Sequence, residues 1–96
     1  MGRKSLAEQY YEETSEKGDA SDATWIVFYD FRGVKPNPRF WKNVRRLIGL
    51  VGGSSMVQYS VFMTGSRRVA ITAVKLARHY GAEVVAFRGE KIEFDV

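Results

Sequence analysis

The run Thr24 to Phe31, with the sequence TWIVFYDF, decides the fold of this chain. Six of its eight side chains are apolar or aromatic, too many for a strand with one wet face. Such a run is typical of a central strand that is covered on both faces. It also carries Asp30, the one acidic residue between Ala23 and Glu83. The sequence therefore predicts a central strand and raises the question of what a lone carboxylate does at its end.

A helix is predicted directly after this strand. Asn37 followed by Pro38 is typical of a helix N-terminus, and apolar side chains recur at helical spacing up to Val51. Gly52-Gly53 would end the element. The opposite face is basic and carries Arg39, Lys42, Arg45 and Arg46. This basic face is either a solvated surface or a surface for a polyanion.

The next segment, residues 56–63 (MVQYSVFM), is predicted to form two short paired strands with a kink at Ser60. Ser66 is placed to cap a second helix that Gly81 closes. Arg67 and Arg68 fall in the first turn of that helix, where cations oppose the helix dipole by several tenths of a kcal/mol. Their position indicates either an anion site or a chance arrangement of surface charge.

Two more strands are predicted near the end of the chain, at residues 83–88 (EVVAFR) and 91–96 (KIEFDV). The strict alternation of the second is typical of an edge strand. Right-handed crossovers place both helices on one face of the sheet. With the kink at Ser60, the order is that of an α+β, ferredoxin-like two-layer sandwich (βαββαβ, plus a C-terminal edge strand) with a mainly antiparallel sheet.

Residues 1–23 differ in composition from the predicted domain of residues 24–96. They carry three basic and six acidic side chains, net −3, whereas the remaining 73 residues carry twelve and five, net +7. Ser5 and Glu8 have the spacing of a capping box, and Gly18 could close a short helix. We expect an acidic N-terminal arm that is either disordered or a short helix beside a basic body.

Composition excludes several classes of function. The 96-residue chain has no cysteine and one histidine, which argues against disulfides, thiolate nucleophiles and zinc sites. No phosphate-binding glycine motif or Ser-His-Asp set is evident, and no apolar run is long enough for a membrane helix. We expect a cytoplasmic protein without membrane contact. Its core is small, so pairing with a second copy would help its stability.

Three interpretations of Asp30 remain open from the residues alone. Its carboxylate could pair with Arg32 or with a helix arginine, or it could fold the turn by bonding to its own backbone. It could also bind Mg²⁺, because sites in open sheets form where strands end. One carboxylate per chain is a poor ion site, but two Asp30 side chains that meet across a two-fold axis could share one ion.

The apolar strand ending in Tyr29-Asp30, the basic first helix and the segment 57–62 (VQYSVF) resemble the smaller CRISPR spacer-acquisition protein family. Its members are metal-dependent endoribonucleases or endonucleases of antiviral defense, and the resemblance covers residues 24–94. It implies a homodimer with the last strand added to the partner's sheet. Asp30 would be the catalytic and metal-binding residue, with one Mg²⁺ shared across the dimer. The protein would bridge dimers of a larger CRISPR integrase.

The resemblance also implies roles for other residues. Tyr29, Ser60 and Phe62 correspond to motif positions with structural or site-lining roles. RNA or double-stranded DNA would be held by basic residues, for which the candidates are Arg32, Arg39, Arg45, Arg46, Arg67 and Arg68. The segment Met63-Thr64-Gly65 and the acidic arm are departures from the family pattern. The alternatives are a non-catalytic scaffold that binds nucleic acid, a related toxin-type ribonuclease, and a small-molecule regulatory module.

Overall fold

A computed structural model describes residues 4–14, 23–33, 35–50, 52–58, 60–90, 92 and 94. Along the chain the elements are α1 (Leu6–Glu13), β1 (Thr24–Asp30), α2 (Pro38–Leu50), β2 (Ser54–Gln58), β3 (Val61–Thr64), α3 (Arg67–His79) and β4 (Glu83–Gly89). The four strands form one antiparallel sheet in the order β2-β3-β1-β4. This is an α+β architecture consistent with the predicted ferredoxin-like sandwich.

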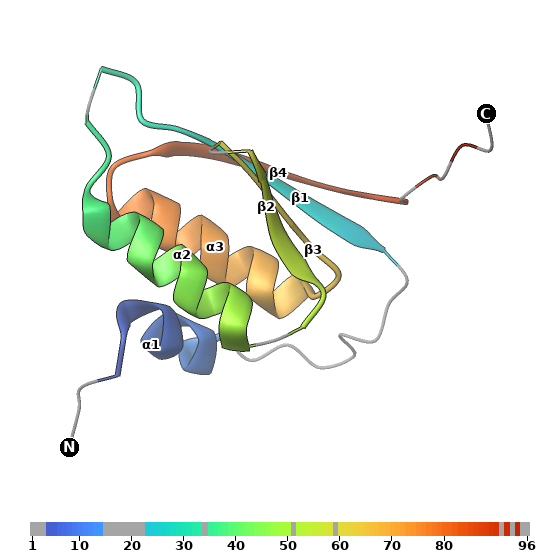
Figure 1. Ribbon diagram of the computed structural model, residues 1–96, viewed down its shortest axis with the longest axis horizontal. Helices are drawn as coiled ribbons and strands as arrows, with labels where there is room; N and C mark the ends of the chain where they lie inside the picture. The colour runs from blue at the N-terminus through green and yellow to red at the C-terminus, as the bar shows by residue number, and fades with distance from the viewer. Residues whose placement is uncertain are drawn as a thin grey trace.

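The elements are stacked in layers (Figure 1). Helices α2 and α3 cover one face of the sheet, as predicted, and α1 packs against both helices on the side away from the sheet. None of the helices among the described residues has the length and apolar character needed to cross a membrane.

Strand β1 is central because its alternate side chains fill the space between sheet and helices. Val27 is fully buried and Tyr29 is 4% exposed. They pack in one core with apolar side chains of β3, α2 and α3, namely Phe62, Phe40, Val44, Leu47, Val69, Ala70, Ala73, Leu76 and Ala77. Burial of this set is the main source of the fold's stability, because each large apolar side chain contributes about 1.5–3 kcal/mol.

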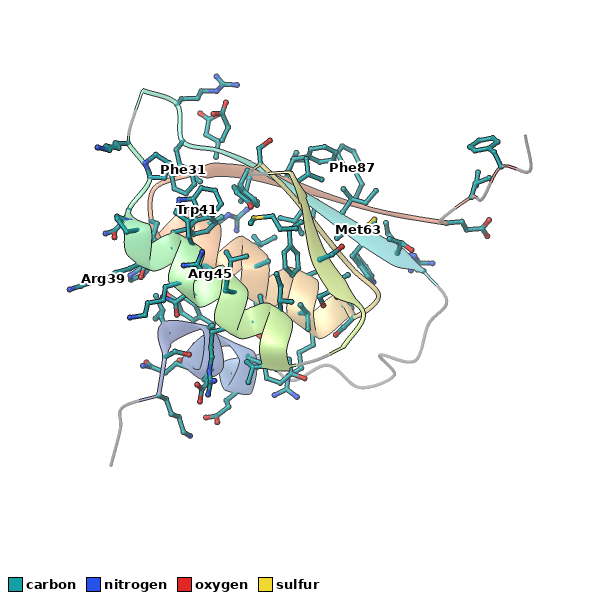
Figure 2. The ribbon with its side chains drawn as sticks, viewed as in Figure 1. Phe31, Arg39, Trp41, Arg45, Met63 and Phe87 are labelled. Carbon is teal, nitrogen blue, oxygen red and sulfur yellow. The ribbon has the colours of Figure 1, made fainter. Side chains whose placement is uncertain are left out.

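The opposite face of the sheet differs from the prediction of a strand covered on both sides. Among the described residues, no helix covers this face (Figure 1), and Phe28, Val85 and Phe87 are 40%, 50% and 56% exposed. The register brings these three side chains together with three from β1 and β3, namely Ile26, Val61 and Met63. We call these six residues the open sheet face; Figure 2 shows its Phe87 on the side away from the helices.

Local signals placed most element boundaries correctly. The chain turns at Ser60 between β2 and β3, and the register of β2 shifts between Met56 and Gln58, as expected of a kinked hairpin. Asn37 accepts a hydrogen bond from the Arg39 backbone N–H (2.9 Å). Ser66 caps α3 by accepting from the Val69 backbone N–H (3.1 Å).

At the two ends of the chain, the structure differs in part from the prediction. The capping box is confirmed, since Ser5 accepts from the Glu8 backbone N–H (3.1 Å), but the helix ends at Glu13 with Thr14 as its C-cap and not near Gly18. Most of the predicted edge strand at 91–96 lies outside the described residues. Its two described residues, Ile92 and Phe94, are not in a strand and are 66% and 78% exposed.

Two leucines of α2 test whether the helix-facing core stabilises the fold. Leu47 is fully buried, whereas Leu50, on the same helix, is 37% exposed. We expect Leu47→Ala to lower the free energy of unfolding by about 2–5 kcal/mol, and Leu50→Ala by less than about 1 kcal/mol. Urea denaturation of both variants measures the difference; equal losses would contradict the assigned core.

Candidate functional site

Asp30 owes its position to the aromatic residues that precede and follow it in the sequence, Tyr29 and Phe31. The Tyr29 ring packs on Phe40 of α2, with the centroids 5.1 Å apart, and Phe31 packs on the same ring at 5.0 Å. Because Tyr29 is anchored on the helix side, strand alternation turns Asp30 to the other face of the sheet. The carboxylate therefore shares a face with Phe28 and the rest of the open sheet face.

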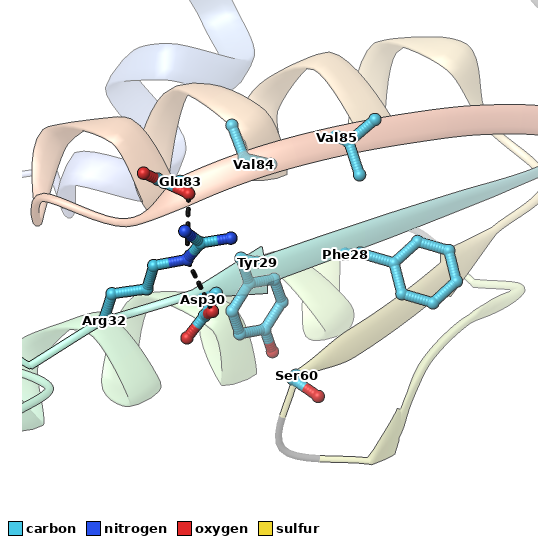
Figure 3. A pocket seen from close by; sticks show the side chains of 8 residues that line it. All are labelled: Phe28, Tyr29, Asp30, Arg32, Ser60, Glu83, Val84 and Val85. Atoms are coloured by element: carbon cyan, nitrogen blue, oxygen red, sulfur yellow. Dashed lines mark hydrogen bonds and ion pairs between the residues drawn. The ribbon is translucent and has the colours of Figure 1, made fainter.

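Glu83 lies directly opposite Asp30 in the sheet. The two residues are register partners on β1 and β4, so their side chains lie on the same face. Arg32 lies between them: its Nε is 3.2 Å from Asp30 Oδ2 and 3.1 Å from Glu83 Oε2 (Figure 3). The predicted pairing of Asp30 with Arg32 is thus present, and Glu83 joins it as a third member.

The electrostatics of this cluster are those of an exposed ion-pair network. The side chains of Asp30, Arg32 and Glu83 are 63%, 72% and 67% exposed. Exposed pairs contribute about 0–1 kcal/mol each to stability, so the cluster is not needed to hold the fold together. Without Arg32, two carboxylates would face each other across the strand pair, which is unfavourable.

A shallow depression of about 450 Å³ contains this cluster. It is lined by Phe28, Tyr29, Asp30, Arg32, Ser60, Glu83, Val84 and Val85. Ser60 comes from the β2–β3 turn, and its carbonyl accepts a hydrogen bond from the Tyr29 backbone N–H (3.1 Å). This bond ties the turn to the end of β1, and Figure 3 shows Ser60 beside Tyr29 at the depression.

The other motif residues lie on the helix-facing side of the sheet. Phe62 is 1% exposed and belongs to the core, so its role here is structural. The Tyr29 hydroxyl donates to the sulfur of Met56 (3.4 Å), and burial raises the pKa of Tyr29 to about 12. This phenol stays protonated at neutral pH and is not a general base.

The carboxylates of Asp30 and Glu83 suit a hard cation, but the Arg32 guanidinium lies between them. Asp30 and Glu83 supply the oxygen ligands that Mg²⁺ prefers, and the depression is open to water for the remaining positions. The Arg32 guanidinium, however, lies where such an ion would neutralise both side chains. The two carboxylates therefore have the chemistry of Mg²⁺ ligands, and in this structure Arg32 is the cation between them.

The six arginines proposed for nucleic acid do not form one surface. Arg32 belongs to the acidic cluster, and Arg39 and Arg45 are exposed on α2. Arg46 pairs with Glu8 of α1 through Nε and Oε1 (2.7 Å). The α2 arginines, with Lys42, line a common hollow, which also contains Ser5, Leu6 and Asn43.

The two arginines of the first turn of α3 lie elsewhere. Arg67 is positioned over the ring of Trp25 (5.8 Å to the centroid), and Arg68 lies over Tyr11 of α1 (3.8 Å). Trp25 and Asp30 are five residues apart on β1, which corresponds to about 17 Å. Arg67 is therefore at the other end of the sheet from the acidic cluster.

The residue that sequence reasoning missed is Glu83. Its position at the start of the predicted strand at residues 83–88, the fourth strand of the βαββαβ order, was the available signal. In an antiparallel βαββαβ sheet the last strand runs beside the first, so its start lies opposite the end of the first. Comparison with protein-family models, with curated proteins and with solved structures found no match for this chain.

Proposed function

We propose that this protein is a homodimeric, metal-dependent nuclease that resembles the smaller CRISPR spacer-acquisition proteins and cleaves phosphodiester bonds in RNA or DNA. The single observation that carries the proposal is that Asp30 lies on the same side of the sheet as the six residues of the open sheet face. Phe28 and Val85 are two positions from Asp30 and Glu83 on their strands. A second copy that covers the apolar residues would bring the acidic clusters of both chains to one interface.

The homodimer follows from the apolar character of that face. Contiguous exposed apolar surface of this kind marks an interaction site. The edge of the open sheet face carries both signs of charge, since Arg32 lies beside Asp30 and Glu83. In a two-fold interface, where each patch meets its own copy, such a rim is self-complementary. The exposed Ile92 and Phe94 add apolar surface after β4 for contact with the partner, in keeping with an association of the C-terminal segment with the partner's sheet.

The proposed chemistry uses the carboxylates of both chains. Asp30, with Glu83 beside it, would hold a Mg²⁺ shared across the dimer. When bound, such an ion lowers the pKa of a coordinated water and neutralises developing phosphate charge. Asp30 would hold the ion in place, and the Arg32 guanidinium, once turned away from the carboxylates, would donate to a phosphate oxygen of the substrate. Ser60 and Phe28 border the depression and limit its width.

Substitution of Asp30 tests the nuclease proposal. We expect wild-type protein to cleave single-stranded RNA or duplex DNA only with Mg²⁺, and Asp30→Asn to cleave at least about 100-fold more slowly, because metal positioning provides several kcal/mol to the transition state. Gel analysis of both substrates measures the rates. Glu90→Gln, which removes an exposed charge just after β4, is the matched control. Unchanged cleavage by Asp30→Asn would refute the assignment.

A second candidate is a non-catalytic scaffold that binds duplex nucleic acid, including one that docks on an integrase. The observation in its favour is the composition of the helix layer. Helices α2 and α3 contain eight Lys or Arg side chains and no Asp or Glu. A surface of this kind neutralises phosphates and releases their counterions on binding.

Salt dependence tests the scaffold. We expect the affinity for a duplex to fall steeply with salt, and Arg39→Gln with Arg45→Gln to reduce the slope of log K against log salt by about two, roughly one per phosphate contact removed. Fluorescence anisotropy across a salt series measures the affinity at each salt concentration and hence the slope. Arg88→Gln, on β4, serves as the control. A flat salt dependence of the wild-type protein would contradict the scaffold function.

A further inference from the structure

Helix α1 brings negative charge to a positively charged surface. Residues Leu6–Glu13 include three glutamates and no Lys or Arg. The helices beneath them, α2 and α3, have eight cations and no acids. Figure 1 shows α1 lying across both helices, on the side away from the sheet. Helix α1, the helical part of the arm that the structure describes, thus lies on the basic surface of the same chain.

Polar contacts hold α1 to α2. Glu8 Oε1 is 2.7 Å from Arg46 Nε, and this hydrogen bond lowers the pKa of Glu8 below its usual value. Asn43 Oδ1 accepts a hydrogen bond from the Ala7 backbone N–H (2.9 Å). Arg46, one of the cations expected to contact nucleic acid, is therefore engaged by a carboxylate of α1.

Polar contacts also hold α1 to α3. Arg68 Nε donates to the Tyr11 carbonyl (2.8 Å), and its guanidinium lies 3.8 Å from the centroid of the Tyr11 ring. Lys75 Nζ donates to Thr14 Oγ1 (2.7 Å). Arg68 sits in the first turn of α3, where a cation opposes the helix dipole. Its contacts with Tyr11 explain why an arginine is found there.

The apolar part of this docking is small. Within α1 only Ala7 is fully buried, while Leu6, Tyr10 and Tyr11 are half-buried against the core cluster. A helix of eight residues is unstable on its own, so α1 depends on its contacts with α2 and α3. Contacts between charges at a surface weaken as ionic strength rises. A polyanion with many phosphates would compete effectively for the same cations.

Three exposed cations of α2 adjoin Arg46, the cation that pairs with Glu8 of α1. Arg39, Lys42 and Arg45 line a hollow with Arg46 at the N-terminal end of α1. Among the described residues, none of these three exposed cations is in an ion pair. A phosphate backbone that binds these three cations would lie next to the Glu8–Arg46 pair.

We propose that α1 is an internal competitor of nucleic acid, which engages Arg46, Arg68 and Lys75 until phosphates of a bound duplex take its place. This inference rests on the nucleic-acid binding of the proposed function. It explains why acidic and basic residues are separated along the chain and yet meet in the fold. It also assigns to α1 a role in setting the affinity of the basic surface.

Two glutamates of α1 provide a matched test. Glu8→Gln and Glu13→Gln each remove one negative charge, but Glu13 is exposed and takes no part in the contacts described above. We expect Glu8→Gln to bind a fluorescent duplex about threefold more tightly than Glu13→Gln at fixed salt, since an exposed ion pair is worth up to a factor of about five in an equilibrium constant. Fluorescence anisotropy measures both affinities.

Hydrogen exchange of the wild-type protein gives a second measurement. We expect saturating duplex to increase exchange of the α1 amides, because α1 is displaced. Equal affinities of the two variants, or unchanged protection of α1 in the complex, would overturn the competition. A complete lack of duplex binding by all three proteins would overturn it together with the nucleic-acid binding on which it rests.

Discussion

The packing of Tyr29 against Phe40 anchors the central strand on the helix layer. It fixes the end of β1 against α2, with the two rings 5.1 Å apart. Strand alternation then places Asp30 on the opposite face, beside Glu83 and the open sheet face. The burial of Tyr29 on the helix side of the sheet thus places the acidic cluster on the opposite face.

The two surfaces of the protein have different chemistry as a result. The open sheet face is apolar and ends in carboxylates, whereas the helix layer carries eight cations and is partly covered by acidic α1. Apolar surface favours burial against another copy, and concentrated positive charge favours a polyanion. A dimer joined through its sheets would leave the helix layers of both chains on the outside, available to nucleic acid.

Local sequence signals predicted most of the fold, because caps and breaks act over a few residues. Asn37, Ser60 and Ser66 each had such a signal, and the elements begin or break where expected. The site was only half predicted. Glu83 joins Asp30 through strand pairing across 53 residues, and Arg46 meets Glu8 through the docking of α1. Neither contact has a local sequence signature, so both could be identified only from the tertiary structure.

Sedimentation velocity shows whether a second copy covers the open sheet face. We expect the wild-type protein to sediment as a dimer and Phe87→Glu to sediment as a monomer, because a buried unpaired carboxylate would be costly. Leu50→Glu, which places the same charge at an exposed apolar position of α2, should remain dimeric. A wild-type protein that stays monomeric at high concentration, or a Phe87→Glu variant that remains a dimer, would rule out a dimer formed through the open sheet face.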